Sequence, residues 1–169
     1  MKFLTLLVVS ALSVGPTDPG GWGNAHWGMT KQQLVERLGA KDVPLKTVWG
    51  PKRESRLGLD FALNTLKFRA YFFVDEVVGL DLVELVCQSV DYLTLADFYR
   101  LEADLTAKYG PPRTRKVDTK QGIDAETKWT VGSTSIDLVL INMSGRAGDK
   151  VIQSKGLSIT YKRGGVDKL

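Results

Sequence analysis

The chain has 169 residues, of which 43% are hydrophobic and 25% are charged, and its formal net charge is +4 at pH 7. This composition is ordinary for a globular protein whose core needs neither disulfides nor a structural metal, and it excludes a disordered or fibrous chain. The basic residues are scattered, so the mild positive charge favours solubility over binding to nucleic acid.

The start of the chain has the pattern of a secretory signal peptide. Lys2 supplies a positive charge, residues 3–12 form an apolar run too short for a stable membrane anchor, and Ser13 ends a stretch that a signal peptidase can read. We therefore expect residues 1–13 to be removed on export, leaving a periplasmic or secreted protein. Residues 14–26 are rich in proline and glycine and are predicted to form an extended or mobile arm.

A first helix is predicted over Lys31 to Leu38. Thr30 can cap its first amides, and Gln33, three residues further on, completes a capping box. Gly39 supplies the left-handed residue that ends the helix. The apolar stripe of this helix is expected to comprise Leu34, Val35 and Leu38.

A second helix with the same capping pattern is predicted over about Leu95 to Tyr109. Thr94 and Asp97 form its capping box, and Arg100 and Asp104 are placed to pair across one turn. Its apolar stripe comprises Leu95, Phe98, Leu101, Leu105 and Tyr109. Two helices with one pattern, each followed by strands, suggest a duplicated α+β unit.

Alternation of apolar and polar residues predicts antiparallel strands after each helix. After the first helix we expect a loop over 40–55 with a short strand near 46–49, and then strands over 59–63, 66–74 and 78–83. After the second helix we expect strands over 123–131, 136–141 and 157–161, with a polar loop over 144–155. The predicted fold is α+β, a tandem helix-plus-antiparallel-sheet repeat with units at 27–90 and 91–169 and both helices on one sheet face.

The sequence carries no recognisable catalytic or metal-binding motif. His26 is the single histidine and Cys87 the single cysteine, so neither a zinc site nor a cysteine–histidine pair is indicated. Cys87 ends an apolar run and is expected to be a small buried residue. We predict no catalytic residue, no metal and no cofactor.

The basic run Arg113 to Lys116 allows two interpretations. It is either a patch for phosphate or lipid head groups, or a charged edge strand that resists aggregation. We favour the edge strand, since an exported protein rarely meets nucleic acid.

The strand over 66–74 is apolar on both faces. Its second face carries Lys67, Arg69, Tyr71 and Phe73, and the two cations belong near water. We predict that these four residues, together with Trp49, form an open sheet face that binds a protein partner with an acidic rim. The alternative is ordinary core, with Trp22 and Trp27 of the arm folded over the aromatic residues.

The motif around the first helix also resembles a known family. Gly28-Met29-Thr30, followed by Gln33-Leu34 and Leu38-Gly39, resembles the G-M-T-x-x-Q-[VL]-x-x-x-L-G signature of the BamE (small protein A) outer-membrane lipoprotein family. The order of elements is similar to the tandem architecture of β-lactamase inhibitor proteins. These resemblances imply an envelope protein that binds other proteins and is not an enzyme. The chain departs from BamE in lacking a lipid-attachment cysteine and in carrying a second helix-and-sheet unit.

We therefore predict an exported bacterial protein that binds a protein partner in the cell envelope and has no enzyme activity. A first alternative is a sugar- or lipid-binding module that uses Trp49, Tyr71 and Trp129, and peripheral contact with a membrane stays open. A second alternative is a hydrolase that uses carboxylates on strands, namely Asp60, Asp81, Glu84, Asp124 and Glu126.

Overall fold

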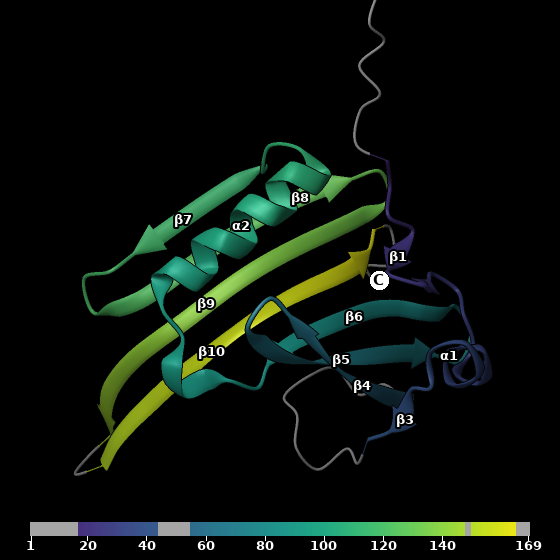
Figure 1. Ribbon diagram of the computed structural model, residues 1–169, viewed down its shortest axis with the longest axis horizontal. Coiled ribbons are helices and arrows are strands. Elements are labelled where there is room, and N and C mark those ends of the chain that lie inside the picture. Colours follow the sequence, from purple (N-terminus) through teal and green to yellow (C-terminus); the bar gives the residue numbers. More distant parts are fainter. Residues whose placement is uncertain (1–16, 44–54, 148–149, 165–169) are drawn as a thin grey trace, which may run out of the picture.

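The computed structural model describes residues 17–43, 55–147 and 150–164 (Figure 1). The predicted signal peptide, Trp49 and the expected strand near 46–49 lie outside the described residues.

Eight strands of the described chain form one antiparallel sheet. In spatial order they are β3 (Lys41–Asp42), β4 (Ser55–Leu63), β5 (Leu66–Asp75), β6 (Gly79–Cys87), β10 (Lys150–Arg163), β9 (Thr134–Ala147), β8 (Gly122–Val131) and β7 (Thr114–Asp118). The elements outside this sheet are the hairpin β1 (Gly21–Trp22) and β2 (Ala25–His26), the helices α1 (Lys31–Leu38) and α2 (Leu95–Tyr109), and the short 3-10 helix η2 (Val90–Tyr92).

The predicted tandem repeat is wrong. The described chain is mostly β-structure in a single large sheet, because β10 pairs with β6 along Ser158 to Lys162 and joins the two halves. The helices are not equivalent either: α2 lies along β8 and β9, whereas Figure 1 shows α1 end-on beside the edge that carries β3 and β4. Capping patterns specify where a helix begins and ends, but they do not specify the surface on which it packs.

The helix boundaries themselves are confirmed. The Thr30 hydroxyl accepts a hydrogen bond from the Gln33 amide at 3.3 Å, and Gly39 has the left-handed conformation with φ 65°. Thr94 and Asp97 form the second capping box. The predicted stripe fails at Val35, which is 42% exposed, so Leu34 is the buried residue of α1. The short helix α1 therefore packs against the core mainly through Leu34.

The side of α2 that faces the sheet is as predicted, but one ion pair on its other side differs. Its buried residues are Phe98, Leu101, Leu105 and Tyr109. Arg100 lies 3.9 Å from Asp97 and does not form the predicted pair with Asp104.

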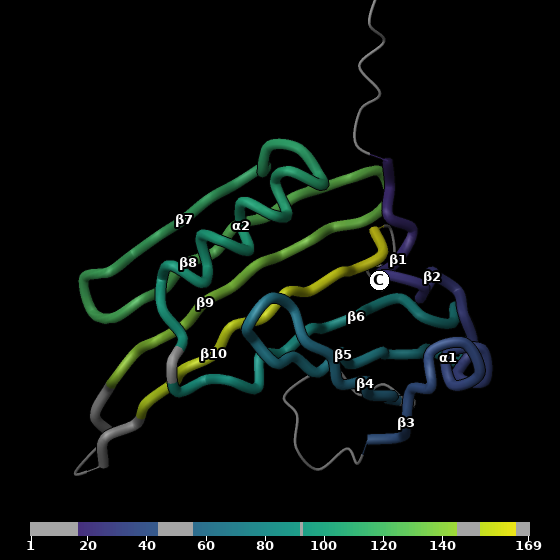
Figure 2. The backbone as a smooth tube through the Cα atoms, viewed as in Figure 1, coloured from purple at the N-terminus to yellow at the C-terminus, as the bar shows by residue number. Residues whose placement is uncertain are grey.

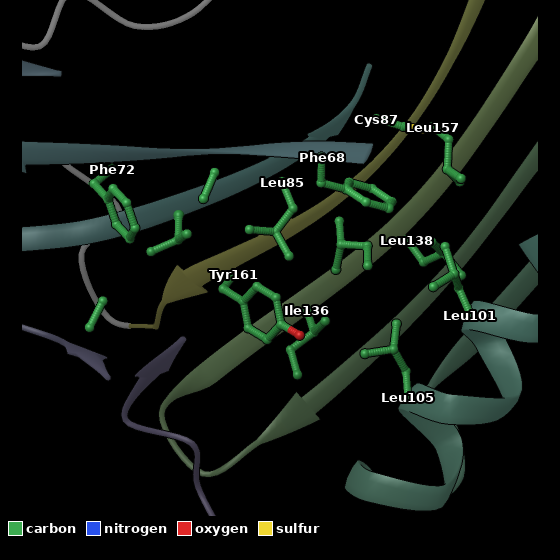
Figure 3. Packing of buried hydrophobic residues seen from close by; sticks show 14 of the residues in the cluster. Phe68, Phe72, Leu85, Cys87, Leu101, Leu105, Ile136, Leu138, Leu157 and Tyr161 are labelled. Atoms are coloured by element: carbon green, nitrogen blue, oxygen red, sulfur yellow. The ribbon is translucent and has the colours of Figure 1, made fainter. Parts of the chain in front are cut away.

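One face of the sheet supplies most of the core. Figure 3 shows Phe68, Leu85 and Tyr161 pointing from neighbouring strands toward the side chains of α2. Cys87 belongs to this cluster, as predicted, and burial raises the pKa of its thiol. The helices and the N-terminal hairpin pack on this face, which we call the core face.

The N-terminal segment differs from the predicted arm. Residues 17–26 pass beside the turn between β8 and β9 and form the hairpin β1–β2 (Figure 2). The Asp18 carboxylate accepts hydrogen bonds from the Ser133 amide at 2.6 Å and from the Thr134 hydroxyl at 2.7 Å. The Trp22 ring packs on Phe72 from the core face. These contacts fix a segment whose composition alone indicates mobility.

Two further expectations concern residues 144–155 and the basic run that became strand β7. The polar loop over 144–155 is wrong, since β9 continues to Ala147 and β10 begins at Lys150, with Ser144 opposite Gln153. A hairpin that extends beyond the core can carry polar residues on both faces, and it then shows no alternation.

The charged edge strand is confirmed: β7 is the last strand of the sheet, and its Lys116 pairs with Asp124 at 2.7 Å.

Candidate functional site

The sheet has a second face, turned away from the core face, which we call the open face. The described helices and the N-terminal hairpin contribute their buried side chains to the core face. Strand register places residues from six strands on the open face: Arg56, Asp60, Ala62, Lys67, Arg69, Tyr71, Phe73, Leu82, Glu84, Val86, Gly156, Ser158, Thr160, Lys162, Asp137, Val139, Ile141, Asp124, Glu126 and Lys128.

Small residues run along the middle of the open face. The central strand β10 presents Gly156, Ser158 and Thr160, and the strands beside it place Val86 and Val139 opposite Ser158. A β-carbon added at Gly156 would meet no atom within 4 Å. The centre of this face therefore has free space above it, with half-buried valines on both sides.

Four neighbouring side chains on this face, Arg56, Tyr71, Phe73 and Glu84, are called the Arg56 cluster. The Arg56 guanidinium carbon lies 3.9 Å from the centre of the Tyr71 ring and 5.2 Å from the centre of the Phe73 ring. Tyr71 is in turn opposite Glu84 on β6. Three neighbouring strands thus bring a cation, two aromatic rings and a carboxylate together.

Burial shapes the electrostatics of this cluster. Arg56 is 4% exposed. Burial lowers the pKa of the Arg56 guanidinium, and the nearby Tyr71 and Glu84 act in the opposite direction. Burial raises the pKa of the Glu84 carboxyl, an effect that Arg56 partly offsets. Both charges are therefore held in a poorly hydrated environment, where interactions between charges are stronger than in water.

A second half-buried carboxyl lies across the centre of the face. Asp137 on β9 and Glu84 on β6 are both opposite Thr160 of β10. Burial raises the pKa of Asp137, and Lys128 acts to lower it. The open face is thus a mixed surface of charged, aromatic and aliphatic groups, unlike the fully polar outer face common in antiparallel sheets.

The structure brings four of the predicted binding residues onto one face. Lys67, Arg69, Tyr71 and Phe73 share it, but they differ in exposure. Phe73 is 5% exposed, because Arg56 lies over its ring, so its predicted exposure is wrong. Arg69 donates to both oxygens of Asp60, at 2.6 and 2.7 Å. Tyr71 is half-buried and Lys67 is exposed. The predicted fifth residue, Trp49, lies outside the described residues.

The structure does not support the sugar-stacking residue set. Trp129 is 1% exposed in the core, and its indole N–H donates to the Gly110 carbonyl at 3.1 Å. It cannot stack on a ligand from there. Trp22 also packs on the core face, so it does not cover Tyr71.

The carboxylates proposed for a hydrolase are dispersed. Asp60, Asp124 and Glu126 form ion pairs with Arg69, Lys116 and Lys128. Asp81 is buried where the β5–β6 register shifts, and Glu84 is half-buried. No group of three or more histidines, cysteines or acidic residues in the described ranges could hold a metal ion.

Sequence reasoning missed Arg56. Alternation along β4 places it on the polar side of the strand, opposite to Leu57 and Leu59. Its burial depends on Phe73, which stands opposite it on β5 and is distant in sequence. A local pattern carries no signal for such a contact.

Comparison with known proteins gives no match: no family model, no curated protein and no solved structure matches the chain. The resemblance drawn from the first helix therefore stays a prediction. Among the helices that the structure describes, none is long and apolar enough to cross a membrane.

Proposed function

We propose that this protein is an exported, non-catalytic binding protein that holds another protein on the open face of its sheet. The observation that carries the proposal is the composition of that face. It combines the Arg56 cluster with aliphatic side chains around the strip of small residues on β10.

The aliphatic residues of the open face are contributed by both halves of the chain. Leu82 and Val86 come from β6, and Val139 and Ile141 come from β9. Met143, further along β9, is 41% exposed. Aliphatic and aromatic groups surrounded by charged residues are typical of surfaces that bind other proteins. The charged residues around them favour a reversible interface over a permanent one.

Export is supported by the apolar pattern of residues 3–12. A non-catalytic role is supported by the pairing of Asp60, Asp124 and Glu126 with basic side chains and by the buried position of Cys87. A thiol whose pKa is raised by burial is a poor nucleophile.

A substitution at Gly156 tests the proposal without disturbing the fold. Gly156→Arg places a large cation in the free space above β10, where an added β-carbon meets no atom within 4 Å. The matched control is Ala103→Arg on α2, an exposed position in a helix that packs on the core face. Circular dichroism and urea denaturation should show that both variants fold like the wild type.

The assay is capture from a cell-envelope extract with the tagged mature chain, counting only protein that the untagged chain displaces. We expect the wild type and Ala103→Arg to capture the same partner, and Gly156→Arg to lose it. Capture that survives Gly156→Arg at the wild-type level, or the absence of any displaceable partner, would overturn the proposal.

A further inference from the structure

The Arg56 guanidinium is buried without a hydrogen-bond partner for two of its nitrogens. Among the described residues, its Nε and Nη2 are the buried side-chain nitrogen or oxygen atoms that have no such partner. Buried polar groups are almost always paired, and buried charges are paired or neutralised, because an unpaired one carries a large desolvation cost. An exception of this kind needs an explanation in what the residue does.

The contacts around Arg56 offset only part of that cost. The Tyr71 ring, 3.9 Å from the guanidinium carbon, provides a cation–π interaction. Glu84 favours the charged guanidinium electrostatically, but Nε and Nη2 of Arg56 have no hydrogen-bond partner. Neither contact supplies a hydrogen-bond acceptor for Nε and Nη2. The cluster therefore holds the guanidinium in place but leaves its Nε and Nη2 atoms without hydrogen-bond partners.

The neighbouring arginine on the same face shows what this edge binds. On Arg69, the Nε atom donates to Asp60 Oδ1 at 2.6 Å and the Nη2 atom donates to Asp60 Oδ2 at 2.7 Å. These are the same two atoms that are vacant on Arg56. A carboxylate matches the spacing of this edge and forms two parallel charge-assisted hydrogen bonds with it.

We propose that Arg56 is the carboxylate-binding residue of the open face, and that the side chain of an aspartate or glutamate of the partner pairs with its Nε and Nη2. This inference rests on the proposed function, since the partner that covers the face brings the acidic residue. Because both nitrogens are buried, this pairing requires neighbouring side chains to move, and the half-buried Tyr71, whose ring lies 3.9 Å from the guanidinium carbon, is the reporter of binding. Glu84 repels the incoming carboxylate and sets an upper limit on its affinity.

The first arm of the test uses the isolated mature chain with acetate as the probe and chloride at equal ionic strength as the control. Nuclear magnetic resonance follows the Nε–H signals of Arg56 and Arg69, assigned through Arg56→Lys and Arg69→Lys. We expect a saturable shift at Arg56 and at the Tyr71 ring, with little change at Arg69, which is already paired. Glu84→Gln should tighten acetate binding several-fold, because it removes the repelling charge.

The second arm asks whether Arg56 is needed for the fold or for the partner. Arg56→Met replaces the guanidinium by an apolar side chain, and the urea midpoint of the isolated chain should stay the same or rise. In the capture assay the same variant should bind the partner at least about tenfold more weakly, since it removes one side of a buried charge pair.

The outcomes separate this inference from the proposed function. Equal, non-saturating shifts at Arg56 and Arg69, or a marked fall in the urea midpoint of Arg56→Met, would overturn the role of Arg56. Unchanged capture by Arg56→Met would do so as well, because the carboxylate would then not come from the partner. If Gly156→Arg still abolishes capture in those cases, the binding face stands and only the carboxylate site fails.

Discussion

The hydrogen bonds that the Asp18 carboxylate accepts near the β8–β9 turn, which we call the Asp18 clamp, give a quantitative prediction. Burial acts to raise the pKa of Asp18, but hydrogen bonds from the Gly20 and Ser133 amides and from the Thr134 and Ser133 hydroxyls outweigh it and lower the pKa from 3.8 to about 2. A difference of this size corresponds to roughly 2.4 kcal/mol of stability at neutral pH. Because the carboxylate is partly exposed to solvent, we reduce this figure to about 1–2 kcal/mol.

The pH at which this contribution disappears follows from the direction of the shift. A carboxyl whose pKa is lower in the folded state stabilises the fold above its unfolded pKa, and the contribution is lost as the pH falls through the folded value of about 2. Asp18→Asn should therefore destabilise the chain by about 1–2 kcal/mol at pH 6. The difference from the wild type should shrink below about pH 4 and vanish near pH 2.

Urea denaturation of the mature chain across this pH range measures the effect, with Asp91→Asn at an exposed position as the charge-matched control. A destabilisation by Asp18→Asn that stays constant from pH 6 to pH 2 would show that the negative charge of the clamp is not what stabilises it. Gly132→Ala offers a second, independent perturbation, because φ there is +57° and the new β-carbon would collide with the Asp18 carboxylate.

Three further predictions concern the caps, the open face and processing. Thr30→Ala and Thr94→Ala should each lower the free energy of unfolding by about 1 kcal/mol, as measured by urea denaturation, and no change in either would mean that the hydroxyls do not stabilise the helix starts. Phe73→Ala should cost about 3 kcal/mol, because the ring is buried, whereas Tyr71→Ala should cost clearly less and weaken partner capture; equal losses of stability would contradict the difference in burial. N-terminal sequencing of the protein recovered from the cell envelope should begin near Val14, and a retained Met1 in the cytosolic fraction would refute export.

Local features of the fold are predictable from the sequence, and distant ones are not. The capping boxes at Thr30 and Thr94 involve residues three positions apart, so the sequence specifies both helix starts. The pairing of β6 with β10 joins segments about 70 residues apart, and no local pattern indicates it. Asp18 meets Ser133 across an even longer separation of 115 residues, so no local pattern in the Pro- and Gly-rich segment indicates its contacts.

The same division applies to the site. Alternation along β5 places Tyr71 beside Lys67 and Arg69 on one face, and this is how the structure arranges them. The exposure of each residue depends on its neighbours on other strands, which is why Phe73 is buried against expectation and the burial of Arg56 was missed. The alternation along one strand predicts the sheet face on which a residue lies, but it does not predict the solvent exposure of that residue.

The position of β10 has a consequence for the order in which the protein can fold. This strand occupies the middle of the sheet, between β6 and β9, yet it is the last strand of the described chain to emerge during synthesis. Until it arrives, β6 and β9 each present an unsatisfied edge, and the two halves have nothing to align them. A chain whose central strand is made last stays without its complete sheet for longer, so the proposed export would meet a chain that has not yet folded.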